Sequence, residues 1–201
     1  MEHRGDTYIS VNYKKEEYKF LELSPYSKNI DSWQRAIDIF EDRIEGRYLK
    51  VLSNLMDQNN LMRDGFVIMA VNCLLLETLL QFKMGWDETP SGQNKSSYKI
   101  FLKEAFPTVF KTNKSAEKFY TDIRCGILHS AQTKKKSKLT FDKNYVIDLV
   151  NYEGEDYIYV DVYYMTQAIE KYYLNYVRNL KVENHSDRFN FVKKMDYICK
   201  K

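Results

Sequence analysis

Glycine is scarce in this chain, and so are the motifs that depend on it. The seven glycines are isolated from one another, so the sequence contains neither G-x-G-x-x-G nor a phosphate-binding loop ending in Gly-Lys-Ser/Thr. It also lacks H-E-x-x-H, an acidic calcium-binding loop and G-x-S-x-G. The three histidines, His3, His129 and His185, lie far apart, so metal-ligand spacing is missing. We expect neither a metal nor another cofactor.

Cysteine is also rare. The chain has three cysteines, an odd number, and they are widely spread without a C-x-x-C pair, namely Cys73, Cys125 and Cys199. This pattern argues against a disulfide framework or a zinc cluster and fits a reducing compartment. The sequence begins with mostly polar and charged residues, so a secretory signal is not expected. These features predict a cytoplasmic protein.

Long hydrophobic runs are missing as well. The best candidate for a membrane span covers about fifteen residues, 66–80, and it includes Asn72 and Glu77. It is too short and too polar to cross a bilayer. Because its centre is apolar almost all round, we expect it to be the central helix of a bundle and not a membrane anchor.

The composition is that of a soluble globular protein, with 201 residues, 44% apolar and 29% charged. Residues 1–28 hold several tyrosines among polar groups, and we interpret them as an N-terminal arm, either a short strand or irregular. Residues 29–201 form the expected helical domain. Apolar residues recur at intervals of three and four positions. This spacing predicts helices over about 31–58, 61–83, 96–106, 114–131, 162–180 and 187–199. Asp31 or Ser32 is the expected N-cap of the first of these helices.

Between residues 139 and 160 apolar residues recur at every second position instead of every third or fourth. Residues 139–141 and 145–150 look like strands, and a turn at 153–156 leads into a further strand at 157–160. The predicted fold class is therefore mainly α, a helical bundle with a small β-hairpin inserted before its last helices.

Positive charge is concentrated in one stretch. The stretch from Lys111 to Lys143 contains nine basic and three acidic residues, which gives it a local net charge of +6. Such a field attracts polyanions. The densest part is a lysine run that we expect to hold an RNA backbone, namely Lys134, Lys135, Lys136 and Lys138. The alternative for this run is a solvated loop after a helix.

Within the same stretch the sequence reads R-x-x-x-x-H, from Arg124 to His129. A guanidinium and an imidazole are the groups needed to grip a phosphate and move a proton at neutral pH. Five residues correspond to about 140° around a helix, so we expect that one helix cannot hold both side chains against the same small group. The structural alternatives are an arginine paired with Asp122 or Glu117 and a histidine at a helix end.

Two further features of this region bear on a site. Gly126 lies in a helix interior, where it costs about 1 kcal/mol relative to alanine, and close approach of another helix would require it. Glu77 and Asp122 could pair as carboxylates on facing helices. The alternative for Glu77 is a structural carboxylate satisfied by a lysine or a backbone N–H.

Residues 119–131 resemble the signature helix of the HEPN superfamily (higher eukaryotes and prokaryotes nucleotide-binding domains). Residues 73–82, which include Glu77, look like the long core helix of the same fold, and the resemblance covers about residues 30–180. It implies a helical bundle that dimerises with the motif helices facing each other, and Gly126 would then lie at the dimer interface. Active members are metal-independent endoribonucleases found as toxins, phage-defence effectors and RNA-processing enzymes, whereas others bind nucleotides or partners. Cys125 departs from the Asn or Asp that often follows the family's arginine.

The resemblance and the residues together predict an endoribonuclease that cleaves RNA by attack of a 2′-hydroxyl. His129 would be the general acid and base, and Arg124 would stabilise the phosphorane, with Glu77, Tyr120, Asp122 and Cys125 as supporting residues. The expected partners are RNA, a second copy of the chain, and an antitoxin or regulatory protein. Two alternatives stay open, namely a non-catalytic module that binds RNA, a nucleotide or a protein, and a purely structural helical protein.

Overall fold

The computed structural model describes residues 7–58, 60–141 and 143–200. The chain divides into two compact units, and two long helices, α4 (Leu61–Met84) and α8 (Val162–Lys181), contribute to both. The first unit contains the stretch up to Val51, Gln81–Glu88 and the stretch from Leu174 onwards. The second contains Leu52–Leu80 and Thr89–Tyr173. The protein is mainly α, as the sequence predicts.

The first unit is built around a cluster of aromatic side chains. Phe40, on helix α2 (Ile30–Ile44), lies 4.7 Å from Phe82 and 5.5 Å from Phe191 between ring centroids. Tyr176 contacts Phe40 and Phe82 edge-on. All four rings are buried. Phe191 comes from α9 (Ser186–Lys200), so the cluster joins residues from distant parts of the sequence.

The N-terminal segment contains more structure than the expected arm. Tyr8 forms an isolated β-bridge with Lys14, and a short helix, α1 (Lys15–Lys19), follows. Asn12 donates hydrogen bonds from its backbone and its side chain to the Asp42 carboxylate, and Arg43 donates to the Ile9 carbonyl oxygen. Residues 7–28 are therefore tied to α2 by polar contacts that no apolar periodicity announces.

The predicted long helix at 31–58 is present, with two differences. Its N-cap is Asn29, whose side chain accepts a hydrogen bond from the Ser32 N–H at 3.1 Å. The prediction of Asp31 or Ser32 was therefore wrong by two or three residues, because the helix begins before the apolar stripe does. A π-helical turn, η1 (Glu45–Leu49), separates α2 from α3 (Lys50–Asp57).

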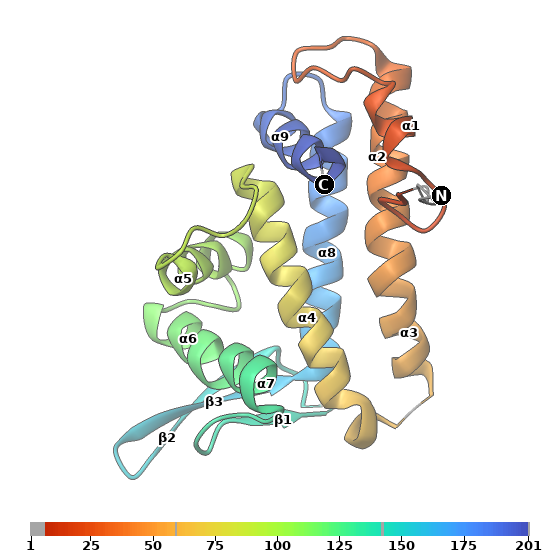
Figure 1. Cartoon of the computed structure of the whole chain (residues 1–201). Helices are drawn as coiled ribbons and strands as arrows, with labels where there is room; N and C mark the ends of the chain where they lie inside the picture. The colour runs from red at the N-terminus through yellow and green to blue at the C-terminus, as the bar shows by residue number, and fades with distance from the viewer. Residues whose placement is uncertain (1–6, 59, 142, 201) are drawn as a thin grey trace, which may run out of the picture. The chain divides into compact units, whose positions relative to one another are not determined.

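The second unit combines helices with a small sheet. Figure 1 shows its elements after α4 in green and cyan, followed by α8 in blue. They are α5 (Asn94–Ala105), α6 (Asn113–Lys118), the π-helix η2 (Phe119–Arg124), α7 (Cys125–Ser130), β1 (Lys138–Thr140), β2 (Ile147–Tyr152) and β3 (Glu155–Asp161). Segments α6, η2 and α7 together correspond to the helix predicted at about 114–131.

The sheet has the order β1-β3-β2. Strands β2 and β3 form the predicted antiparallel hairpin, with Leu149 opposite Ile158. Its two-residue turn, Glu153-Gly154, has positive φ at both positions, which is typical of the type I′ turns that suit hairpin twist. Strand β1 pairs in parallel with β3, with Leu139 opposite Val160. Parallel pairing joins strands that are not neighbours along the chain, so the alternating pattern did not predict it.

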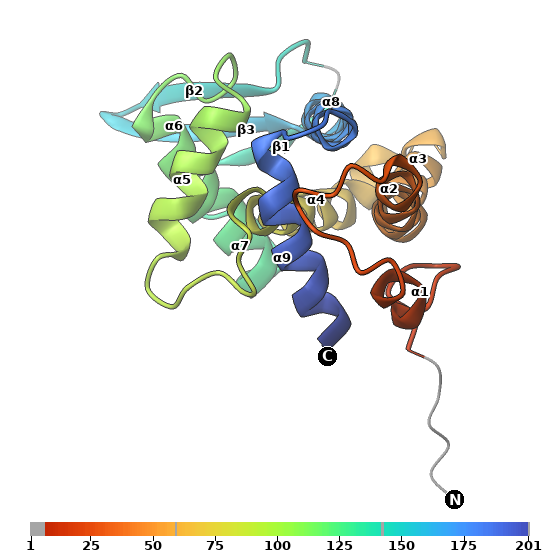
Figure 2. The same ribbon diagram turned by 90° about the horizontal axis from the view of Figure 1, so that it is seen from above.

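Helix α6 lies along one face of this sheet in both views (Figures 1 and 2). Lys114 on α6 forms an ion pair with Asp156 on β3, and the Lys118 ammonium lies 6.0 Å from the centre of the Tyr157 ring. The hairpin therefore supports the segment that carries Arg124 and His129.

Helix α4 is not buried on all sides, contrary to the prediction from its composition. Ile68, Met69, Cys73 and Leu76 are buried, but three other apolar residues, Phe66, Val67 and Leu74, are 40%, 55% and 42% exposed. We call these last three residues the α4 stripe. By length and composition alone, α4 is also the one helix in the described part of the chain that could cross a membrane, and 56% of its most apolar window is buried.

The aromatic cluster gives a first prediction. Replacing Phe40 with alanine removes a completely buried ring and leaves a cavity among Phe82, Tyr176 and Phe191, so we expect the free energy of unfolding to fall by about 3–5 kcal/mol. Urea denaturation followed by circular dichroism measures it. Phe189→Ala removes a ring that is 49% exposed and is the matched control. An equal effect of the two substitutions would contradict the assigned core.

Candidate functional site

Arg124 and His129 meet within a single chain. The Nη1 atom of Arg124 lies 3.4 Å from Nε2 of His129, at the long limit of a hydrogen bond. The expectation that one helix cannot bring the two groups together was wrong. It assumed regular α-helical rotation, whereas Arg124 ends the π-helix η2 and His129 lies in α7. The long arginine side chain also reaches beyond the direction set by its Cβ. Single π-turns occur frequently at functional sites.

Glu77 fixes the arginine from α4. Its Oε2 accepts a hydrogen bond from Arg124 Nη2 at 2.5 Å, and its Oε1 accepts one from the Thr89 hydroxyl at 3.3 Å. The two paired side chains are only 11% and 23% exposed, for Arg124 and Glu77 respectively. Glu77 therefore does not pair with Asp122, which the sequence had left possible, and the cation that satisfies Glu77 is an arginine, not the lysine of the structural alternative.

Tyr120 forms another wall around the guanidinium. Its ring centre lies 5.5 Å from Arg124 Cζ, within cation–π range, and it packs edge-on against Tyr98. Burial and the neighbouring Cys125 thiol raise the pKa of the Tyr120 phenol. Burial alone would lower the pKa of Arg124, but the Glu77 carboxylate raises it above its ordinary value. Arg124 is thus a permanently charged group held in one orientation, beside an exposed His129.

Asp122 has a different role from the expected one. It is buried, and its carboxylate accepts hydrogen bonds from the hydroxyls of Ser137 and Thr121, both at 3.0 Å. The Lys118 ammonium lies 3.6 Å from the same carboxylate. The backbone carbonyl oxygen of Asp122 accepts a hydrogen bond from the Lys134 N–H at 2.8 Å. Asp122 therefore anchors the loop that carries the lysine run and does not face Glu77.

Gly126 is explained by that same loop. A Cβ on Gly126 would lie 2.5 Å from the Gln132 carbonyl oxygen and 3.1 Å from the Lys134 nitrogen. Backbone atoms cannot swing aside as a flexible side chain can, so the position requires glycine within one chain. The close approach that we expected from another helix is made by the chain's own residues 132–134, and Gly126 is no longer evidence for a dimer interface.

The lysine run divides into two parts. Lys136 pairs with Glu153 at 3.2 Å and lies 4.0 Å from the centre of the Tyr152 ring, and Lys138 lies 5.7 Å from that of Tyr159. Each of these two lysines therefore lies beside a tyrosine ring of the hairpin. The tyrosines were not among the predicted site residues, because nothing in the sequence indicates which strand lies beside the loop.

Lys134 and Lys135 line a basic pocket of about 630 Å³ together with Lys114 and Lys118 of α6. Glu117 also lines it, but its carboxylate binds Lys95 and Lys99, which lower its pKa to about 2. The two lysines of the loop have no such compensation among the described residues. They are the members of the run that are most available to a phosphate.

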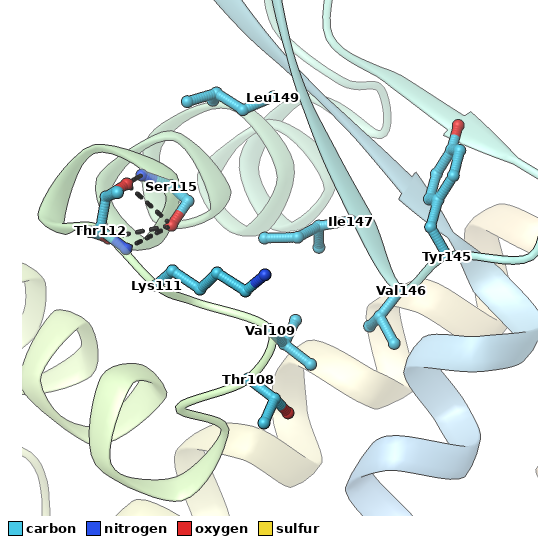
Figure 3. A pocket seen from close by; sticks show the side chains of 9 residues that line it. All are labelled: Thr108, Val109, Lys111, Thr112, Ser115, Tyr145, Val146, Ile147 and Leu149. Atoms are coloured by element: carbon cyan, nitrogen blue, oxygen red, sulfur yellow. Dashed lines mark hydrogen bonds between the residues drawn. The ribbon is translucent and has the colours of Figure 1, made fainter.

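A second pocket in this unit, of about 470 Å³, lies between residues 108–115 and the segment 145–149 (Figure 3). Lys111 extends into it, facing Ile147 and Val146. The hydroxyls of Thr112 and Ser115 bond to each other at the start of α6. These two hydroxyls are used to cap α6. Lys111 is therefore the charged group of this pocket that is exposed to a ligand.

Metal-ligand groups are not gathered anywhere in the described chain. In residues 7–58, 60–141 and 143–200, no three His, Cys, Asp or Glu side chains lie close enough together to hold a metal ion. His3, one of the three histidines, lies outside the described residues. The side chains assembled around Arg124 suit phosphate binding and proton transfer.

The packing around Gly126 gives a second prediction. Gly126→Ala places a methyl group against backbone, so we expect a loss of about 1–3 kcal/mol in unfolding free energy, although alanine favours helix. Chemical denaturation at two protein concentrations measures it, with Ser130→Ala, at an exposed position of the same helix, as the control. A loss that appears only where the protein self-associates would instead place Gly126 in an interface between copies.

Comparison with other proteins adds no family to these observations. The sequence matches no protein-family model, and neither a curated protein nor a solved structure matches it. The mainly α fold is therefore established from the structure alone. The function has to be argued from the chemistry of the site formed by Glu77, Tyr120, Arg124 and His129.

Proposed function

We propose that this chain is a HEPN-like, metal-independent endoribonuclease with Arg124 and His129 at its active centre. The observation that carries the proposal is the position of His129, exposed and 3.4 Å from an arginine that Glu77 holds. This arrangement provides a proton acceptor beside a fixed positive charge, which is what in-line cleavage of a phosphodiester by an internal nucleophile requires.

In the proposed reaction, neutral His129 takes the proton of an RNA 2′-hydroxyl. The 2′-oxygen attacks the adjacent phosphorus, and Arg124 Nη1 donates to a non-bridging oxygen as negative charge develops there. The 5′-oxygen leaves with a proton from an imidazolium. The products are a 2′,3′-cyclic phosphate and a 5′-hydroxyl end. DNA lacks the attacking hydroxyl and is spared.

Glu77 and Tyr120 act through Arg124 in this scheme and are positioning residues. The Glu77–Nη2 bond leaves Nη1 free to face His129, and the Tyr120 ring limits movement of the guanidinium. The cost of the arrangement is that Glu77 offsets part of the charge on Arg124. Lys134 and Lys135 supply uncompensated charge for the RNA backbone and read no sequence.

A homodimer is still part of the proposal, for a different reason. One chain brings Arg124 and His129 together, so the geometry of the pair no longer requires a second copy. The reaction, however, uses both a base and an acid, and a second His129 would provide the other. The α4 stripe and Leu128, which is 40% exposed, offer apolar surface for such contact, and Leu74 and Leu128 lie within three residues of Glu77 and His129 in sequence. An antitoxin or regulatory protein is a further proposed partner.

The cleavage test uses purified protein and mixed single-stranded and structured RNA in EDTA. We expect cleavage that leaves cyclic-phosphate ends, reduced about 10²–10⁴-fold by His129→Ala and about 10²–10³-fold by Arg124→Ala. His185→Ala and Arg178→Ala are the matched controls, with folding checked by circular dichroism. RNA left intact by the wild type, or cleaved equally by His129→Ala, would overturn the proposal.

The alternative function is a non-catalytic module that binds RNA or a nucleotide on the same basic face. The ion pair of Arg124 with Glu77 is the observation that favours it, because an arginine whose charge is partly offset by a carboxylate stabilises a phosphorane less well. In this case His129→Ala would leave RNA affinity nearly unchanged and no cleavage would be seen in any variant.

Both functions predict salt-dependent RNA binding through the loop. Neutralising Lys134 and Lys135 with glutamine should weaken binding and lower the slope of log affinity against log salt by about 1.4 for a single strand, the value for two lost phosphate contacts. Fluorescence anisotropy at several salt concentrations measures it. The control pair is Lys50→Gln with Lys193→Gln, two exposed lysines of the first unit. An unchanged slope would identify the loop lysines as merely solvated.

A further inference from the structure

A pocket in the first unit lies at the start of α2, beside the turn between α8 and α9. Its volume is about 380 Å³, which is within the range of small-molecule sites. Ile30 of α2, which is 80% exposed, supplies apolar surface above the buried Trp33 and Ile37, and three basic residues, Lys28, Lys181 and Arg188, supply positive charge. None of these residues belongs to the site proposed for RNA cleavage.

Arg188 is the unusual residue of this pocket. It is only 6% exposed, its Nε donates to the Leu180 carbonyl oxygen at 2.8 Å, and its Cζ lies 4.2 Å from the centre of the Trp33 ring. These contacts fix the plane of the guanidinium. They leave both Nη groups without a hydrogen-bond or ion-pair partner among the described residues.

None of the acids near Arg188 forms an ion pair or a hydrogen bond with its guanidinium among the described residues. Asp187 is directed elsewhere and binds Lys83 at 2.6 Å and Asn179 at 2.9 Å. Glu183 lines the pocket and acts on Arg188 only through its charge. Burial, in turn, lowers the pKa of Arg188. A buried guanidinium that no carboxylate contacts directly carries a desolvation cost that an anionic ligand would relieve.

The charge around the pocket indicates a doubly negative ligand. Lys28, Lys181 and Arg188 against Glu183 give a net charge of +2, and Glu41, outside the pocket, attracts Lys181 as well. A phosphate monoester carries about −1.5 to −2 at neutral pH. A guanidinium of fixed plane suits bidentate binding of its oxygens, and lysines at the rim act as point charges.

We propose that this pocket binds a small phosphate monoester, with the two Nη groups of Arg188 on phosphate oxygens and Lys28 and Lys181 at the rim. The organic part of the ligand lies against Ile30. The inference is independent of the proposed ribonuclease activity, because it uses none of the residues assigned to that reaction.

The test is isothermal titration calorimetry of the full chain with inorganic phosphate and with phenyl phosphate, at fixed ionic strength. We expect saturable binding of one ligand per chain, tighter for phenyl phosphate because its ring contacts Ile30. Lys28→Gln with Lys181→Gln should weaken it at least about tenfold, the effect of one lost charge-assisted hydrogen bond. Lys50→Gln with Lys193→Gln, which makes the same charge change elsewhere, should leave it unchanged.

Arg188→Gln should abolish binding, but it also removes the contacts with Leu180 and Trp33, and this loss can prevent folding. The double lysine variant keeps the proposal testable in that case, because both of its side chains are exposed. The absence of saturable binding to the wild type would overturn the proposal. Equal weakening by the two lysine pairs would also overturn it, since the affinity would then be a general effect of net charge.

Discussion

The ion pair between Glu77 and Arg124 is the contact on which the candidate site depends. It joins α4 to the π-helix η2 across 47 residues of sequence, and both side chains are largely buried. Removing two charges from water costs about as much as their attraction returns, so the pair adds little to stability. We infer that it determines orientation, because a guanidinium bound at Nη2 and packed against Tyr120 can present Nη1 in only one direction.

The helical segment formed by α6, η2 and α7 contacts α4 with one face and the following loop with another. Arg124 lies on the face toward α4, where it meets Glu77. Asp122 and Gly126 lie on the face toward the following loop, which they hold through the Ser137 hydroxyl and through close backbone contact. The lysines of that loop are therefore placed by the same helix that carries the arginine. Asp122, expected as a supporting residue of the site, contributes to the position of the basic surface.

Much of the fold could be predicted from local patterns. The helices at 61–84, 162–181 and 186–200 and the hairpin at 147–161 lie where periodicities of 3.6 and 2 place them. The parallel pairing of β1 and the contacts of the N-terminal segment were not predictable in this way. Each depends on hydrogen bonds between residues distant in sequence, and such bonds leave no period. The exposed α4 stripe was missed because composition does not show how many neighbours a helix has.

The sequence by itself determined the residue types of the candidate site. An arginine, a histidine five residues later and a run of lysines are groups suited to phosphate chemistry, and the sequence alone shows that the chain contains them. Only the tertiary structure decided how these groups meet. A π-turn and a glutamate from another helix bring Arg124 to His129 in one chain, and a returning loop occupies the space beside Gly126. The physical reason is that helical rotation fixes only where a side chain starts, whereas its end is positioned by partners that the fold brings from elsewhere.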